Sequence, residues 1–520
     1  MCGLSGSWNL SKEVVMKMAT HQISRGPDRL GIEECGEVIF SQNRLAIIDK
    51  SEAGNQPMTN PQGILSYVGE IYNYSIQFST DTAWVLDKLM SVNDYSQVFN
   101  SFNGMWALAY YDKLNKEIIL CKDRFGIKPL YYTHQKDFFA FASTPAAVAL
   151  TKNNWDISQK GLQEYLSLGA TMLHSMFEGI EAVPPGHYVT FNCKTNEVKV
   201  KRWYYPKFIE NALETIQEKV EKAIDKVKLT CDWPQIILLS GGIDSTIVAS
   251  RYSSQKAIHL ASPEQEYAQK VADRFGIHLN NVHPHDFSVE ECLLDYTSKC
   301  GDPTMAGFIP YITCKEIKKL GFRVAITANG ADELFFGYDR MNGFCEDQRN
   351  HICRNFPFSE DIVDEVRQQL TISFLGFPMP NMQWFEICTY LMFDLNKTLD
   401  FASMCHSVEV RVPYLDHELV EAALSVPQDK HIGKFGNKTI LKKMLVDLGF
   451  DFSFIHRPKV GFSLHHEPSD LAAMKNKAMD WYKSTDMPKL DEDKITGRQS
   501  SYHSMTVLGL YVWCKIYGKL

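Results

Sequence analysis

A short apolar run at residues 236–239 ends in a turn with two glycines, and a helical pattern begins at about Ser245. A second strand-like run at 323–327 leads in the same way through Asn329-Gly330 into another short helical segment. Strands that alternate with helices argue for a parallel sheet with helices on both faces. Ligands of such sheets bind beyond the carboxyl ends of the strands, where both glycine turns lie. This pattern predicts an α/β unit whose binding site is formed by the two turns.

The chain before this unit has a different character. Short apolar runs separated by turn residues recur through the first ~190 residues, a usual length for one domain, at 38–40, 45–48, 64–68, 105–111, 117–121, 138–142 and 188–191. Such runs are typical of strands, and two packed antiparallel sheets would accommodate them. We therefore expect two domains: an α+β sandwich of antiparallel sheets over 2–190, and the α/β unit over 205–520. An amphipathic helix at 213–227 opens the second domain, and its segments are mostly helical after about residue 358.

Composition limits the possible partners. A chain of 520 residues with a net charge of −8 is too long for one core and has no basic footprint for nucleic acid. It begins without a signal-peptide pattern, and no apolar run is long enough to span a membrane. Its thirteen cysteines are scattered without metal-binding spacing, which indicates a reducing compartment. We expect a cytoplasmic protein that binds small molecules, with no nucleic-acid or membrane partner.

The first glycine turn reads Ser240-Gly-Gly-Ile-Asp-Ser245. Gly241 and Gly242 let backbone N–H groups approach a phosphate closely, and the following helix N-terminus favours negative charge. The hydroxyls of Ser240 and Ser245 add donors. The Gly-Lys-Ser/Thr ending of a Walker loop is absent, so an ordinary glycine turn with helix-capping side chains is an equal alternative on spacing alone.

The second turn favours the phosphate interpretation. Asp244 would repel a phosphate unless a cation intervened, and Asp332 follows the second strand. Two carboxylates that converge on a polyphosphate make a Mg²⁺ clamp. Asp244 and Asp332 are therefore the candidate metal ligands.

Cys2 is the candidate nucleophile of the first domain. Removal of Met1 would leave Cys2 with a free α-amino group, which can take the thiol proton without a histidine base. A chance cysteine at a disordered terminus is the alternative, and the cysteine alone does not exclude it.

A set of motifs in a fixed order resolves this choice. The chain has Arg25-Gly-Pro-Asp28, Arg44-Leu-Ala-Ile-Ile-Asp49, Gln56-Pro57, Gly69-Glu-Ile-Tyr-Asn73, Asp81-Thr82 and Asp123-Arg-Phe-Gly-Ile-Lys-Pro-Leu-Tyr-Tyr132 after Cys2-Gly3. Together these resemble class II glutamine amidotransferases. The Ser-Gly-Gly-Ile-Asp-Ser turn resembles the PP-loop of ATP pyrophosphatases. With Ser262-Pro263, Glu409-Val-Arg-Val-Pro-Tyr-Leu-Asp416 and Arg457-Pro-Lys-Val-Gly-Phe-Ser463, the whole chain resembles glutamine-hydrolysing asparagine synthetases.

The resemblance implies roles for residues of the first domain, which would have the N-terminal nucleophile fold. Cys2 would attack the glutamine amide and Arg44 would hold the glutamine α-carboxylate. Asp81, with Gly69 and Glu70, would hold the α-amino group, and the Gly69 N–H would stabilise the oxyanion. The family has an asparagine directly before the Gly-Glu-Ile-Tyr-Asn motif, where this chain has Val68. Loss of one oxyanion donor costs about 10²–10³-fold in rate, so the glutaminase is expected to be slow unless another donor replaces it.

The resemblance also assigns the second domain. ATP would be cleaved to AMP and pyrophosphate to activate a carboxylate as an acyl-adenylate, which ammonia then attacks. Lys459 would stabilise the departing pyrophosphate. Besides the first glycine turn with Asp244, the residues implied near the nucleotide are Leu239, Leu260, Thr327 and Ala328. Ammonia would pass between the domains through an internal channel, and the family often forms homodimers.

One departure concerns the acceptor acid. The chain reads Thr327-Ala-Asn-Gly-Ala-Asp-Glu333 where the family has a glutamate at the position of Asn329. An amide cannot act as a general base, but it can hydrogen-bond a substrate. Aspartate is therefore the presumed acceptor, and a sugar acid or specialised metabolite is the alternative. A catalytically weak regulatory homologue and a ring-forming synthetase are further hypotheses, which the retention of Cys2 and of both sites' central groups disfavours.

Overall fold

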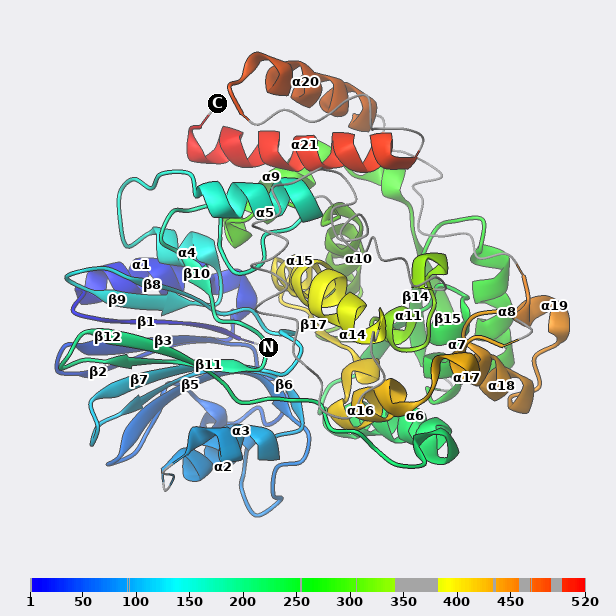
Figure 1. Cartoon of the computed structure of the whole chain (residues 1–520), viewed down its shortest axis with the longest axis horizontal. Helices are drawn as coiled ribbons and strands as arrows, with labels where there is room; N and C mark the ends of the chain where they lie inside the picture. The colour runs from blue at the N-terminus through cyan, green and yellow to red at the C-terminus, as the bar shows by residue number, and fades with distance from the viewer. Residues whose placement is uncertain are drawn as a thin grey trace.

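The computed structural model describes residues 2–519 except Ser91, Asn93, Ser253, Ser254, Met305, 342–381, Lys434, Phe435, 458–467, Ser469 and 488–497. The described chain forms two halves that lie side by side (Figure 1). The first contains two stacked sheets, and the second contains one sheet surrounded by helices.

Two antiparallel sheets form the first half. One has the order β10 (Glu181–Ala182), β8 (Tyr131–His134), β9 (Phe139–Ala142), β1 (Gly3–Trp8), β3 (Val38–Arg44) and β2 (Arg29–Cys35). The other has the order β12 (Glu197–Arg202), β11 (His187–Asn192), β7 (Glu117–Lys122), β6 (Gly104–Asp112), β5 (Gly63–Ile71) and β4 (Met58–Thr59). The predicted sandwich of antiparallel sheets is confirmed.

The two sheets enclose an apolar core. Alternate side chains of each strand point inward, as the pleat of a strand requires, and Leu4, Phe40, Ile64, Val68 and Phe141 belong to one buried cluster. Helices cover the outer faces: α1 (Lys12–His21), α4 (Pro145–Ala149) and α5 (Gln159–Leu168) on one side, α2 (Asp81–Leu89) and α3 (Tyr95–Ser101) on the other (Figure 1).

The prediction of a strand at 45–48 is wrong. After β3 the chain leaves the sheet and these residues form an irregular loop. Leu45 and Ile47 are nevertheless buried in the core, which explains the apolar pattern. The burial of a loop segment beside Cys2 thus gave the sequence the apolar pattern of a strand.

A parallel sheet organises the second half, as predicted. Its order is β15 (His278–Val282), β14 (Lys256–Leu260), β13 (Gln235–Leu238), β16 (Val324–Ile326) and β17 (Glu409–Arg411). The chain runs outward from β13 through β14 to β15, then crosses to β16 on the other side of β13. The carboxyl ends of β13 and β16 therefore lie at a topological switch point, where such sheets bind ligands.

Helices complete this half. The predicted helix at 213–227 is confirmed as α6 (Ala212–Leu229), and it is followed by α7 (Ile243–Ser250), α8 (Gln265–Phe275), α9 (Val289–Cys300), α10 (Phe308–Lys319) and α11 (Ala331–Leu334). The predicted helical C-terminal part has α14 (Met382–Glu386), a π-helical stretch η5 (Ile387–Leu395), α15 (Asn396–Met404), α16 (His417–Ser425), α17 (Gln428–His431), α18 (Thr439–Asp447), α19 (Phe452–Ile455), α20 (Leu471–Ser484) and α21 (Arg498–Tyr517).

Candidate active sites

Cys2 immediately precedes β1 and is 8% exposed. Its Sγ accepts a hydrogen bond from the Leu45 N–H at 3.5 Å, and its carbonyl oxygen accepts one from Arg25 Nε at 3.3 Å. The thiol belongs to the cluster between the sheets that also contains Val68. A nucleophile in this position has a fixed backbone and an apolar surround.

Val68 is fully buried in the same cluster. Because its side chain is aliphatic, position 68 offers no side-chain hydrogen-bond donor to the nucleophile. The next residue, Gly69, has a φ of +119°. A Cβ at this position would lie 2.0 Å from the carbonyl oxygen of Met105 on the neighbouring strand. Only glycine can therefore occupy this turn of β5, and its N–H is the main-chain donor that the sequence predicted for the oxyanion.

Arg44 ends β3 and holds the loop that follows. Its Nη1 donates to the Ser51 carbonyl at 2.7 Å and to Asn55 Oδ1 at 2.9 Å, and its Nη2 donates to the Asp49 carbonyl at 2.7 Å. The guanidinium is thus buried in the same half as Cys2 and bonded to residues of this loop. Its predicted contact with the glutamine carboxylate stays a prediction.

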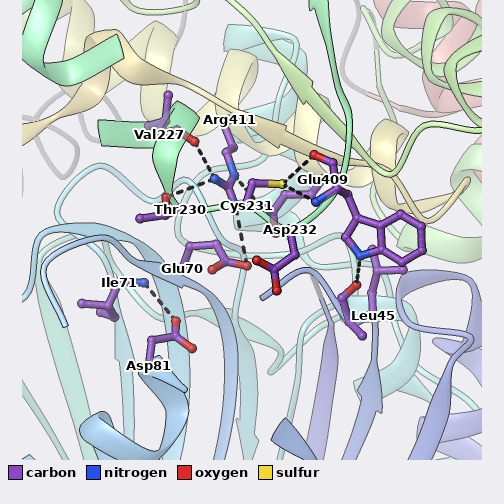
Figure 2. Close-up of polar contacts among 12 residues, drawn as sticks. Leu45, Glu70, Ile71, Asp81, Val227, Thr230, Cys231, Asp232, Glu409 and Arg411 are labelled. Carbon is purple, nitrogen blue, oxygen red and sulfur yellow. Dashed lines mark hydrogen bonds and ion pairs between the residues drawn. The ribbon is translucent and has the colours of Figure 1, made fainter. Parts of the chain in front are cut away.

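Two buried carboxylates lie near the end of β5. Asp81, the first residue of α2, accepts hydrogen bonds from the Tyr67 hydroxyl at 2.8 Å and the Ile71 N–H at 3.1 Å. Burial raises the pKa of Asp81, although these hydrogen bonds oppose the shift. Glu70 points toward the second half of the molecule, where Arg411 Nη2 lies 3.8 Å from its Oε1 (Figure 2).

Burial is the largest influence on the Glu70 carboxyl. It raises the pKa of Glu70 well above its ordinary value, the carboxylates of Glu409 and Asp81 add to this shift, and Arg411 and the N-terminal amino group oppose it. An arriving α-ammonium group would favour the ionised carboxylate. This electrostatic environment supports the predicted binding of a glutamine α-amino group.

The glycine turn of the second half begins where β13 ends. Gly241 has a φ of +80°, and α7 starts at Ile243, directly after the turn. The hydroxyls of Ser240 and Ser245 are 2.9 Å apart, and the Gly242 N–H donates to Ser240 Oγ at 3.1 Å. The turn therefore gathers hydroxyls and main-chain donors at a helix N-terminus, which suits a phosphate.

The other predicted nucleotide residues lie along the same sheet edge. Leu239 follows β13, Leu260 ends β14, and Thr327 with Ala328 follows β16. Thr327 Oγ1 donates to the Asn329 side-chain oxygen at 2.9 Å, so this hydroxyl orients the amide. The structure thus brings together the predicted residues of both turns.

Lys438 was missed by the sequence analysis. Its Nζ lies 2.5 Å from Asp244 Oδ2 and 2.5 Å from Asp332 Oδ1, so both predicted metal ligands point at one cation. Asp244 lies in α7, Asp332 lies in α11, and Lys438 directly precedes α18 (Figure 1). Burial alone would lower the pKa of Lys438, but the two carboxylates raise it above its ordinary value. The sequence held no signal for this contact, because Lys438 lies about a hundred or more residues from both partners and in no motif used for the prediction.

The two carboxylates fit Mg²⁺ because they already converge on a positive charge, and oxygen ligands are those that Mg²⁺ prefers. Phosphate oxygens of a nucleotide would complete the coordination. Within the described residues, no group of three or more His, Cys, Asp or Glu side chains could hold a metal ion by itself. Lys459, the predicted pyrophosphate lysine, lies outside the described residues.

A second missed cluster follows Asp332. The Tyr338 hydroxyl donates to Glu333 Oε1 at 2.7 Å, and the Arg340 guanidinium makes two 2.7 Å hydrogen bonds to Glu386. Burial, with the nearby Asp332, raises the pKa of Glu333 to about 7. Tyr338 and Arg340 follow Asp332 along the chain, and the contact of Arg340 with Glu386 joins residues 46 positions apart, which no sequence pattern connects.

Among the described helices, none combines the length and apolar character needed to cross a membrane.

Family comparisons agree with both halves. A family model described as a glutamine amidotransferase domain matches residues 1–204, and one described as asparagine synthase matches residues 215–496. Asparagine synthetase (glutamine-hydrolyzing) 3 of Bacillus subtilis (strain 168) is 25% identical over an alignment of 563 residues. The match covers 90% of this chain and 88% of the relative.

Two further relatives are similar at the same level. Putative asparagine synthetase (glutamine-hydrolyzing) 1 of Methanocaldococcus jannaschii is 26% identical over 439 residues, 78% of this chain and 72% of the relative. Amidase chry2 of Gibberella zeae is 27% identical over 406 residues, 66% of this chain and 58% of the relative. The chain therefore belongs to the asparagine synthase family, with a glutamine amidotransferase domain before the asparagine synthase region.

Proposed function

We propose that Cys2 hydrolyses glutamine within residues 2–190, and that residues 205–520 use the ammonia to amidate a carboxylate that ATP has activated. The observation that carries this proposal is the pairing of two sites in one chain. Cys2 is held at its Sγ and its carbonyl oxygen in a buried position, and the Ser240–Ser245 turn lies at the switch point of the parallel sheet.

In the first reaction the Cys2 thiol attacks the side-chain carbonyl carbon of glutamine. The free α-amino group of Cys2 accepts the thiol proton, since an unperturbed α-amino pKa is about 7.7–8.0. The Gly69 N–H donates to the developing oxyanion, and Glu70 with Asp81 binds the substrate ammonium. Collapse of the intermediate releases ammonia and leaves a thioester, which water hydrolyses to glutamate and free thiol.

In the second reaction an oxygen of the acceptor carboxylate attacks the α-phosphorus of ATP, and pyrophosphate leaves. Ammonia then attacks the acyl carbon, and AMP leaves with the amide as the product. Asp244 and Asp332, whose carboxylates converge on the Lys438 ammonium, would hold Mg²⁺, which would neutralise phosphate charge. Ser240, Gly241, Gly242 and Ser245 would donate to the phosphates.

Asparagine from aspartate is the presumed product, since two of the relatives above carry the name asparagine synthetase. A different acid is the second candidate, and Asn329 is the observation that favours it. Thr327 fixes the side-chain oxygen of Asn329, which leaves the amide N–H groups to donate to an acceptor oxygen on the substrate. A glutamate at this position would instead accept hydrogen bonds or take a proton. The relative named amidase chry2 shows that similar chains carry other names.

Two experiments test the proposal. Cys2→Ala is expected to abolish glutamate release and glutamine-dependent synthesis while ammonia-dependent pyrophosphate release continues; equal use of glutamine by this variant would overturn the assignment of the nucleophile. For the acceptor, pyrophosphate release with ATP, ammonia and a panel of carboxylic acids is followed by mass analysis of the amide. Efficient turnover of aspartate alone would establish asparagine synthesis and refute the alternative acceptor.

A further inference from the structure

One residue contacts both proposed sites. Arg411, in the edge strand β17 of the parallel sheet, is completely buried. Its side chain reaches Glu70 in the glutaminase half, and its carbonyl oxygen accepts a 3.0 Å hydrogen bond from the Thr327 N–H at the nucleotide site. The main chain and the side chain of this residue thus connect two reaction centres that lie in different halves of the molecule.

The Arg411 guanidinium is held firmly on the side of the parallel sheet. Its Nε donates to Glu409 Oε1 at 2.7 Å, and its Nη1 donates to the Val227 carbonyl at 2.6 Å and to Thr230 Oγ1 at 3.2 Å (Figure 2). These three contacts fix the plane of the guanidinium group. The side chain therefore moves only with β17 and with the end of α6.

The contact with Glu70 is incomplete by comparison. Arg411 Nη2 is buried, and it makes no hydrogen bond to the described residues. Its distance of 3.8 Å from Glu70 Oε1 is within ion-pair range but too long for a hydrogen bond. A small approach of the Glu70 carboxylate toward Arg411 would complete this bond, and an entering ammonium would favour the ionised carboxylate, which is the stronger hydrogen-bond acceptor.

The path from Arg411 to the nucleotide is short. β17 pairs with β16 in parallel, with Ile326 opposite Arg411, so the strand end that carries Thr327 is hydrogen-bonded directly to it. Further along the same segment, the Tyr414 hydroxyl donates to the Asp244 carbonyl at 3.3 Å. A shift of β17 would therefore displace residues in both turns that form the proposed ATP site, through these two hydrogen bonds.

We propose that Arg411 is a positioning residue of the glutaminase reaction: it orients Glu70 for the glutamine α-ammonium and makes glutamine binding depend on occupancy of the nucleotide site. This inference rests on the proposed function, because it takes Glu70 as a glutamine ligand and Thr327 as a nucleotide neighbour. It adds a coupling between the two sites that neither site requires for its own chemistry.

The wild-type protein provides the first test. Glutamate release is measured over a range of glutamine concentrations, with and without saturating Mg²⁺ and α,β-methylene-ATP, an analogue that cannot be cleaved between the α- and β-phosphates. We expect the analogue to change the KM for glutamine by about fivefold or more, the lower end of usual coupling between sites. An unchanged KM would overturn the proposal without the need of any variant.

Two variants locate the coupling at Arg411. Arg411→Lys keeps a buried positive charge but lacks the planar fork that can bond Glu409 and Glu70 together. The double variant E409Q/R411M removes both charges of the pair, which avoids leaving the Glu409 carboxylate buried alone. Both are expected to raise the KM for glutamine and abolish the effect of the analogue, and Arg411→Lys, which keeps Glu409, is expected to leave the glutaminase kcat unchanged. Persistence of the effect in both variants would contradict the role of Arg411.

Lys397→Met is the matched control. Lys397 is a buried cation that also bridges the halves, since its Nζ donates to the Thr171 carbonyl at 2.5 Å and to Thr171 Oγ1 at 2.7 Å, but it contacts neither Glu70 nor β16. It is expected to retain the analogue effect on KM. Loss of the effect here too would make the coupling a general property of the interface and overturn the specific proposal. A wild-type protein that releases no glutamate would instead refute the proposed function.

Discussion

Lys438 neutralises the two carboxylates that the sequence assigns to a metal. A lysine ammonium and a hydrated Mg²⁺ ion cannot occupy the same point, so binding of Mg²⁺ by both carboxylates would require the Lys438 side chain to move. The Lys438 charge offsets the repulsion between Asp244 and Asp332, since two like charges in a partly buried site repel each other.

Replacing Lys438 is expected to make the apoprotein responsive to Mg²⁺ alone. In Lys438→Met the two carboxylates lose their counter-charge. Breaking a buried ion pair costs about 3–5 kcal/mol, and we expect the lower end because the Asp244 and Asp332 side chains are 16% and 22% exposed. Thermal unfolding without nucleotide measures this: the variant should unfold at a lower temperature, and millimolar Mg²⁺ should restore part of the loss while leaving the wild type nearly unchanged. An equal response of both proteins would show that Lys438 does not occupy the metal position.

Val68 sets a second expectation at the residue scale. It lies in the apolar cluster with Cys2, where the family has an asparagine side chain. Val68→Asn is expected to raise the glutaminase kcat by about tenfold or more, part of the 10²–10³-fold that one oxyanion donor contributes. A buried amide without a full set of partners should also lower stability by about 1–3 kcal/mol.

The control for this change is Val68→Ala, which removes volume without adding a donor and should not raise kcat. If Val68→Asn folds and its kcat equals that of the wild type, another group already stabilises the oxyanion in this chain. Steady-state glutamate release and thermal unfolding of the same preparations separate these outcomes.

At the scale of elements, alternation and periodicity predicted the segments that carry an apolar pattern, including the short strands β13 and β16, and missed those that do not. The helix α6 and the strands β5 to β7 repeat a clear pattern over many residues. β17 has only three residues, and two of them, Glu409 and Arg411, are charged, so no apolar pattern marks it. Its burial is possible because the two charges pair with each other, while its place in the sheet depends on pairing with β16, which lies about eighty residues earlier in the chain.

The same limit applies to the sites. Motifs placed Cys2, Gly69 and the Ser240–Ser245 turn, because these positions depend on local backbone geometry that only certain residues allow. Lys438 and the Arg411–Glu70 contact join segments more than a hundred residues apart. Contacts of this kind follow from the packing of the halves, for which one sequence contains no local signal.

α17 ends with a buried histidine that should make the protein sensitive to acid. His431 is fully buried, its Nε2 lies 3.1 Å from the Ala423 carbonyl, and burial lowers its pKa to about 4. An unfolded histidine has a pKa of about 6.5. Between these two pKa values the unfolded chain binds a proton at this histidine and the folded protein does not. The stability contributed by His431 is therefore present above pH 6.5 and is lost as the pH falls toward 4.

His431→Gln removes this titration. We expect the variant to be less stable than the wild type at pH 7.5, because the ring packs against Phe335 and Phe336, but to lose less stability between pH 7.5 and pH 5. Chemical unfolding at the two pH values measures the difference. The same loss in both proteins would show that His431 does not remain neutral in the folded state.

At the scale of the whole molecule, the second half supplies part of the environment of the nucleophile. Asp400 of α15 lies 2.8 Å from Arg25 Nη2 and 3.3 Å from Lys128 Nζ, and all three side chains are buried. Arg25 in turn donates to the carbonyl oxygen of Cys2. One carboxylate of the second half thus balances two cations of the first half, one of which holds Cys2, the proposed nucleophile.

Asp400→Asn is therefore expected to lower both the stability and the glutaminase rate. The change leaves Arg25 and Lys128 buried without a counter-charge, a loss of about 3–5 kcal/mol for a buried pair. Burial already lowers the pKa of Lys128 against the effect of Asp400, so this lysine should lose its proton in the variant, while Arg25 retains its charge and moves toward solvent. That movement withdraws a hydrogen bond from Cys2, so glutamate release should fall more than ammonia-dependent pyrophosphate release.

Lys397→Met, three residues earlier on the same helix, removes a different buried interface charge and should lower stability without this selective loss. If Asp400→Asn lowers both activities in the same proportion, the cluster stabilises the interface as a whole and does not position the nucleophile.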